Sequence, residues 1–247
     1  MNCRYDSLRT DMLDFVPDGV RRILDVGCAT GAFSEALQEL RPALETWGIE
    51  SDPAATEMAR SRMNSLIVGT YPEVKDQLPV GSFDCVVFND VLEHMVDPGR
   101  ALAATVPLLT STGRIVASIP NVRHLTVLAQ IAIRGDFEYT DTGLLDRTHL
   151  RFFTRRSILR LFADSGWHIE QIVGMNWHPW GRLPVSLQRG LCTLASGRLD
   201  EFFYLQYAVV ARPARDTTAN GFGQAADADG PRVDARVIDD GSTGEVK

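Results

Sequence analysis

The 247-residue chain lacks the features that mark several classes of protein. Its four cysteines, Cys3, Cys28, Cys85 and Cys192, show neither the paired spacing of a metal site nor the density of a disulfide framework. The polar N-terminus has no apolar core of a signal peptide, and no apolar run reaches membrane-spanning length. We therefore expect a soluble cytoplasmic protein with reduced thiols and no membrane partner.

An excess of positive charge is also missing. The net charge is −7 and the sequence pI is about 5.2, which disfavours a broad electrostatic grip on nucleic acid. The one basic cluster consists of Arg147, Arg151, Arg155 and Arg156, and no RNA-binding module accompanies it. We expect a small-molecule or glycan partner rather than a nucleic acid.

Apolar segments that alternate with helical patterns predict an α/β fold. The expected strands are residues 23–26, 46–50, 65–69, 83–88, 113–120, 167–173 and 202–210. Helical patterns cover residues 5–15 and 33–37, and others begin after Asp52, Asp97 and Thr154. This order predicts a Rossmann-like, doubly wound, mainly parallel seven-stranded sheet with helices on both faces.

One domain accounts for most of the chain. Residues 1–211 are expected to form it, and the irregular insertions 121–150 and 174–200 are expected to cap the substrate. In the second insertion, Trp177–Trp180 fits a lid and a helical core equally well. Residues 212–247 are poor in large apolar side chains and are predicted to be a disordered acidic tail.

The organising stretch is Ile23–Gly31, which reads as a strand, a glycine loop and the start of a helix. Gly27 and Gly31 are expected to let a ligand approach the backbone, and the free N–H groups of the helix start favour a carboxylate or phosphate. Dinucleotide-binding loops space three glycines. This loop has only the outer two.

The loop resembles motif I of class I S-adenosylmethionine (SAM)-dependent methyltransferases. The resemblance implies that Asp25 helps to hold the ammonium group of SAM, that the loop receives the methionine end, and that the last strand is antiparallel. An acidic residue ending the second strand, Glu50, suits the ribose hydroxyls. The expected cofactor-binding residues are Asp25, Gly27, Cys28, Gly31, Glu50, Thr70 and Asn89.

A second motif, Asn89–His94, follows the fourth strand. In a helical turn, Asp90, Glu93 and His94 would share one face, and two carboxylates with an imidazole suit a divalent cation. The segment resembles an element of small-RNA 2′-O-methyltransferases and ubiquinone-pathway O-methyltransferases. That resemblance implies a further histidine from the insertion, His149, and a cation such as Mg²⁺ or Mn²⁺ beside the substrate.

The predicted reaction is methyl transfer from SAM to a hydroxyl of a small molecule or glycan, with His94 and His149 as the candidate catalytic residues. A cation would lower the pKa of the acceptor hydroxyl. A histidine acting as a general base without metal, and a purely structural cluster, stay open. So do an N- or C-methyltransferase of a small metabolite and a non-catalytic SAM-binding regulatory module.

Overall fold

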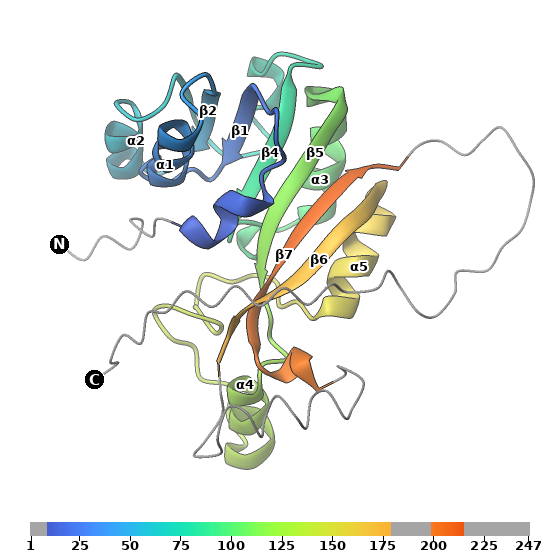
Figure 1. The fold of residues 1–247 in the computed structure, drawn as a ribbon. Helices are drawn as coiled ribbons and strands as arrows, with labels where there is room; N and C mark the ends of the chain where they lie inside the picture. The colour runs from blue at the N-terminus through green and yellow to red at the C-terminus, as the bar shows by residue number, and fades with distance from the viewer. Residues whose placement is uncertain (1–8, 179–198, 215–247) are drawn as a thin grey trace, which may run out of the picture.

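A computed structural model describes residues 9–178 and 199–214. Across these residues the chain forms a seven-stranded sheet with the order β3-β2-β1-β4-β5-β7-β6, drawn in Figure 1. Neighbouring strands are parallel except for the two pairs that include β7. The strands are β1 (Arg22–Val26), β2 (Glu45–Glu50), β3 (Ser65–Val68), β4 (Phe83–Asn89), β5 (Leu109–Pro120), β6 (Trp167–Trp177) and β7 (Tyr204–Pro213). The predicted fold class is confirmed.

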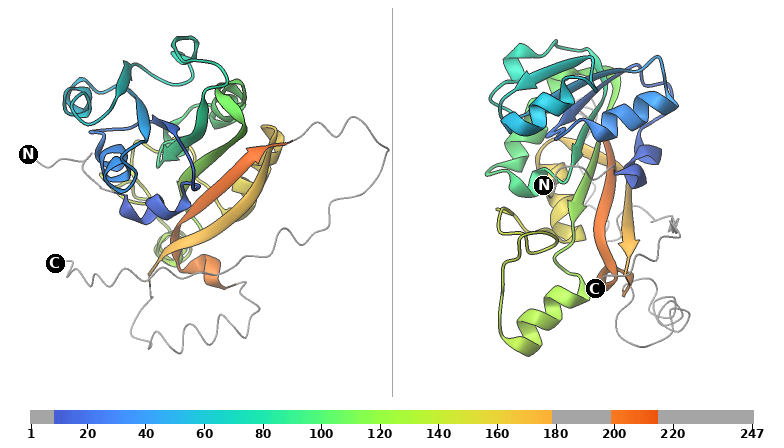
Figure 2. Two further views of the ribbon diagram at one scale, coloured as in Figure 1. Left: turned by 45° about the horizontal axis from the view of Figure 1, so that its top comes forward. Right: turned by 90° about the vertical axis from the view of Figure 1, so that its left-hand side faces the viewer.

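Helices cover both sides of this sheet, as the two views in Figure 2 show. They are α1 (Ala32–Leu40), α2 (Pro53–Ala59), α3 (Pro98–Thr105), α4 (Leu125–Ala129) and α5 (Arg155–Asp164). The 3₁₀ turn η1 (Thr10–Phe15) packs against α1 and β7, and η3 (Leu92–His94) follows β4. Figures 1 and 2 show α4 beyond the carboxyl end of β5, apart from the sheet.

The side chains of β4 alternate between two separate cores. Val86 and Phe88 point into the core that includes residues of α3 and α5. Cys85 and Val87 point into the core on the other face, with residues of η1 and α1. All four are fully buried. A central parallel strand must be apolar on both faces, which explains the uninterrupted hydrophobic run of this segment.

Helix starts are fixed by the residues that the sequence singles out. The Asp52 carboxylate accepts hydrogen bonds from the backbone N–H groups of Ala54 and Ala55, and Asp97 accepts one from Arg100. Thr154 forms a reciprocal capping box at the start of α5. These caps satisfy backbone donors that the first helical turn leaves unpaired. The predicted helix starts are confirmed.

The predicted helix over residues 5–15 is wrong in its described part. That part is the 3₁₀ turn η1, which begins at Thr10 after Arg9 adopts a left-handed conformation with φ of 37°. Met12 and Phe15 are nevertheless buried, because the turn presses them onto the sheet. Burial of two apolar side chains explains the helix-like spacing without an α-helix.

Three strands differ from the predicted bounds by more than one residue. β5 starts at Leu109, before the expected residue 113, and β7 runs from Tyr204 to Pro213. β6 continues to Trp177 because its residues pair with β7, so the second insertion starts later than residue 174. The remainder of the proposed lid and the predicted tail lie largely in residues 179–198 and 215–247, outside the described residues.

Two of the cysteines, Cys28 and Cys85, are free thiols and buried, whereas Cys3 and Cys192 fall outside the described residues. Within the described ranges, no helix combines the length and the apolarity needed to cross a bilayer.

Truncating Phe162 to alanine should destabilise the fold. The ring is fully buried on α5 and packs in the core beneath the sheet, so Phe162→Ala should lower the free energy of unfolding by about 3–5 kcal/mol. Arg156→Ala, at an exposed position of the same helix, should change it by less than about 0.5 kcal/mol. Urea unfolding checks both, and equal effects of the two changes would contradict the assigned core.

Candidate functional site

Two adjoining cavities lie at the carboxyl ends of β1, β2 and β4. The larger has a volume of about 720 Å³ and the smaller about 460 Å³. Both are lined by Gly27, Glu50, Ser51, Val91 and His94. The strand order reverses between β1 and β4, and ligands of open α/β sheets bind at such a reversal.

Asp25 lies on β1 at the floor of the larger cavity and is 2% exposed. Burial raises the pKa of its carboxyl to about 7, an effect that a hydrogen bond from the Ser34 hydroxyl opposes and the Glu50 carboxylate reinforces. A cation bound beside Asp25 would favour the ionised carboxylate. This environment suits the predicted contact with an ammonium group.

Glu50 fastens the glycine loop to the end of β2. Its carboxylate accepts hydrogen bonds from the backbone N–H groups of Ala29 at 2.9 Å, Ser51 at 2.7 Å and Asp52 at 2.8 Å. The residue also lines both cavities, so one side chain fixes the loop and faces the ligand space. Its predicted contact with ribose hydroxyls stays a prediction.

The two glycines of the loop are required for different reasons. Both have positive φ, and a Cβ on Gly27 would lie 2.7 Å from Val91 Cγ2. A Cβ on Gly31 would press on the backbone of Ala59 and the side chain of Met63 instead. Gly27 lines both cavities, so a side chain there would also intrude on the ligand space. Gly31 lines neither cavity, and the close packing of residues 59–63 against it explains why a glycine is needed there.

The remaining predicted cofactor residues divide between the two cavities. Thr70 lines the smaller one, and Cys28 and Asn89 line the larger one. Burial raises the pKa of the Cys28 thiol, so it stays uncharged. The buried side-chain amide of Asn89 has no hydrogen-bond partner among the described residues. The amide therefore has hydrogen-bonding capacity for a ligand group or an ordered water.

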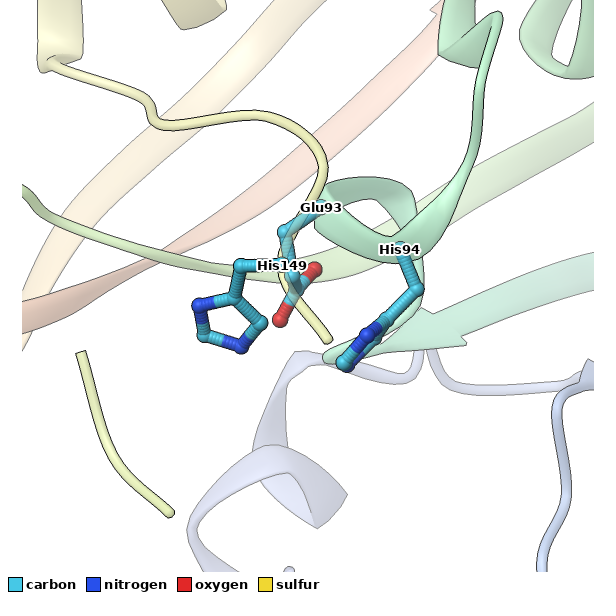
Figure 3. Close-up of side chains that lie close together, drawn as sticks. All are labelled: Glu93, His94 and His149. Carbon is cyan, nitrogen blue, oxygen red and sulfur yellow. The ribbon is translucent and has the colours of Figure 1, made fainter. Parts of the chain in front are cut away.

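Glu93, His94 and His149 converge next to the larger cavity, which His94 lines. One ligand atom from each lies within 4.8 Å of the others, and Figure 3 shows the Glu93 carboxylate between the two imidazole rings. The ring centroids of the two histidines are 4.8 Å apart. His94 also contacts the Thr148 carbonyl, which lies 54 positions later in the sequence. The cluster therefore joins two segments that are distant in the chain.

Asp90 does not join this cluster. The prediction placed residues 90–94 in one helical turn, but η3 begins only at Leu92 and Asp90 has a left-handed φ of 53°. Its carboxylate pairs with the Arg9 guanidinium and accepts a hydrogen bond from the Ser118 hydroxyl. The described geometry therefore removes Asp90 from the candidate ligand set and leaves the other three.

Burial dominates the electrostatics of the cluster. Glu93 is 1% exposed, and burial raises the pKa of its carboxyl to about 8. Neither of its carboxylate oxygens has a hydrogen-bond partner within the described residues. Burial also lowers the pKa of His149, as does nearby His94. The lowered pKa favours the neutral form of the His149 imidazole, which is the form that binds a metal ion.

His124 shapes the loop before α4. It caps α4, and its Nδ1 lies 2.8 Å from the Thr126 hydroxyl. Burial lowers its pKa to about 4. It stands apart from the cavities described above, and His178 lies near its ring at a centroid distance of 6.2 Å.

Comparisons with known proteins agree with this architecture. The sequence profile of a family described as a methyltransferase domain matches residues 1–172. The chain belongs to the class I SAM-dependent methyltransferase family. It is 33% identical over 172 residues to a ubiquinone biosynthesis O-methyltransferase of Xylella fastidiosa, covering 67% of this chain and 68% of the relative.

A second protein with that name, from Xanthomonas axonopodis pv. citri, is 27% identical over 76% of this methyltransferase and 75% of the relative. A crystal structure of a SAM-dependent methyltransferase from Archaeoglobus fulgidus superposes with a TM-score of 0.62 at 18% identity, covering 83% and 92% of the two chains. This structural similarity, at 18% identity, shows that the two proteins share a fold.

Three further residues of the methyltransferase site had no role in the sequence prediction. Arg9 lines the larger cavity from the start of η1, and no sequence pattern marks it. Asp146 and Thr148 line the same cavity from the insertion. Their proximity to His149 in the sequence was the available signal.

Cofactor affinity should rise with pH. If the ammonium of S-adenosylhomocysteine (SAH) pairs with ionised Asp25, binding below the Asp25 pKa of about 7 must expel a proton. Affinity should therefore increase about tenfold from about pH 6 to about pH 8. Calorimetry in buffers of different ionisation enthalpy checks the proton release, and a flat profile would contradict the pairing.

Asp25→Asn provides the control. The variant should bind SAH weakly at every pH. A carboxyl whose folded-state pKa is raised from 3.8 to about 7 loses its contribution to stability as pH rises through about 7. The unliganded variant should therefore have a higher Tm than the wild type at about pH 8, measured by scanning calorimetry, and a lower Tm would argue against a buried charge.

Proposed function

We propose that this methyltransferase transfers the methyl group of SAM to a hydroxyl oxygen of a small molecule or glycan, aided by a divalent cation at Glu93, His94 and His149. The observation that carries the proposal is the convergence of these three side chains beside the larger cavity. The names of the relatives, ubiquinone biosynthesis O-methyltransferases, support oxygen as the acceptor atom.

The three side chains fit a cation in type and spacing. Ligand atoms lie about 2.0–2.2 Å from such an ion, so the ligands of one site are about 3–4 Å apart. The present spacing within 4.8 Å needs only a small closure. The unpaired oxygens of buried Glu93 support a missing positive partner, because buried carboxylates are otherwise hydrogen-bonded.

The donor set favours Mn²⁺ over Mg²⁺. Two imidazole nitrogens and one carboxylate oxygen suit a transition metal, whereas Mg²⁺ prefers oxygen ligands throughout. A bound cation lowers the pKa of an acceptor hydroxyl and fixes its oxygen. Glu93, His94 and His149 would hold that ion, and Asp25 and Glu50 would orient the cofactor.

The acceptor class is supported by the charge of the chain and of the insertion. The net charge of −7 disfavours an RNA acceptor. Within the basic cluster, Arg147 pairs with Asp141 at 2.7 Å, and the Arg151 guanidinium donates to the Val96 carbonyl. Two of the four arginines therefore already have partners within the chain, at the protein surface.

Titration of Mn²⁺ into protein preloaded with SAH tests the cation. Wild type should show one saturable site, and His149→Ala should weaken binding at least about tenfold because it removes one of three ligands. Asp90→Asn is the matched control: Asp90 is paired with Arg9 and lies outside the cluster. Its Mn²⁺ affinity should stay within about threefold of wild type.

Methyl transfer from labelled SAM to a panel of catechols, sugars and amines then tests the acceptor. Mn²⁺-dependent labelling of hydroxyl acceptors supports the proposal. Absence of Mn²⁺ binding together with labelled amines or carbons would replace it with a metal-free methyltransferase that uses a histidine base. Binding of SAH without transfer to any acceptor would indicate a regulatory module.

A further inference from the structure

We propose that the loop Leu144–His149 locks both histidines of the cluster in the tautomer that carries its proton on Nδ1, and that Asp146 is the positioning residue of this loop. The inference rests on the proposed function, because the fixed tautomers would present both Nε2 atoms to the proposed cation. The tautomers themselves are properties of the unliganded protein.

Each imidazole faces a backbone carbonyl from the same loop. His94 Nδ1 lies 3.1 Å from the Thr148 carbonyl oxygen, and His149 Nδ1 lies 3.2 Å from the Leu144 carbonyl oxygen. A carbonyl only accepts hydrogen bonds, so in the neutral rings both Nδ1 atoms must be donors. Each Nε2 then keeps its lone pair, which is the form that binds a metal.

The Asp146 side chain shapes the turn that delivers one of these carbonyls. Its Oδ1 accepts hydrogen bonds from the Thr148 backbone N–H at 2.8 Å and the Thr148 hydroxyl at 2.7 Å. Asp146 is 7% exposed, and its own carbonyl accepts from the His149 N–H at 2.9 Å. An aspartate that bonds the backbone two residues on fixes a local turn. Here the turn orients Thr148.

A backbone clamp sets the position of the loop against η3. The Glu93 carbonyl accepts hydrogen bonds from the N–H groups of Leu150 at 2.8 Å and Arg151 at 3.0 Å. Glu93 thus contributes its side chain to the cluster and its backbone to the loop that carries His149. Since the clamp lies outside residues 144–148, it holds the segment in place without fixing the Thr148 carbonyl.

Asp146 therefore acts on the cluster through Thr148 rather than as a ligand. Loss of its side chain would remove two of the hydrogen bonds that hold Thr148 and keep the backbone bond from the His149 N–H to the Asp146 carbonyl. The Thr148 carbonyl would then be held less firmly, and His94 would exchange between tautomers. The matched substitution is Asp146→Asn, because an asparagine Oδ1 accepts the same two hydrogen bonds. A role as a charged ligand would be lost in this variant, whereas a role in the turn would be kept.

Nitrogen-15 NMR of the unliganded protein at about pH 8 tests the lock directly. Wild type and Asp146→Asn should show both histidines with protonated Nδ1. In Asp146→Ala, His94 should shift toward a tautomer mixture while circular dichroism stays native. A mixture in the wild type, or a fixed His94 tautomer in folded Asp146→Ala, would overturn the inference.

Mn²⁺ calorimetry on the same SAH-loaded variants gives the second readout. Asp146→Ala should bind Mn²⁺ about 10–100-fold more weakly than wild type, the usual effect of losing an outer-shell partner, and Asp146→Asn within about threefold. Equal weakening in both variants would assign Asp146 a direct charge role and overturn the positioning role. Locked tautomers without Mn²⁺ binding in the wild type would refute the metal in the proposed function and leave the lock standing.

Discussion

The parallel pairing of β1 with β4 is the constraint on which the site depends. Asp25 lies opposite Val87 and Val26 opposite Phe88, so the glycine loop after β1 starts beside Asn89, the last residue of β4. Both strands are buried on both faces, and a slip of one residue would reverse every side chain. Packing in the two cores therefore fixes where the glycine loop meets the turn that carries Glu93 and His94.

The site contains two buried acidic side chains whose burial does not favour folding. Asp25 and Glu93 are almost completely buried, and burial raises the pKa of both. Neither faces a basic side chain at ion-pair distance among the described residues, whereas more exposed Asp90 is paired with Arg9. Buried, unpaired carboxyls cost stability. A cationic cofactor at Asp25 and a cation at Glu93 would offset that cost on binding.

The sequence predicted those parts of the molecule that local chemistry determines. The caps at Asp52 and Asp97 and the loop after Asp25 depend on residues close in the chain. The prediction for Asp90 was wrong because no regular helical turn forms there: the backbone at Asp90 is left-handed, and its contacts are with Arg9 and Ser118. Those partners lie 81 and 28 positions away, beyond any local pattern.

The position of His149 likewise depends on contacts between residues that are far apart in the sequence. Its segment was singled out by resemblance alone, and its approach to Glu93 rests on two backbone hydrogen bonds that no periodicity encodes. The sheet thus places Asp25 and Glu50, and an insertion clamped onto one short turn places His149. Because that turn, η3, follows β4, changes within the insertion would alter the surroundings of His149 while the β1–β4 register keeps Asp25 in place.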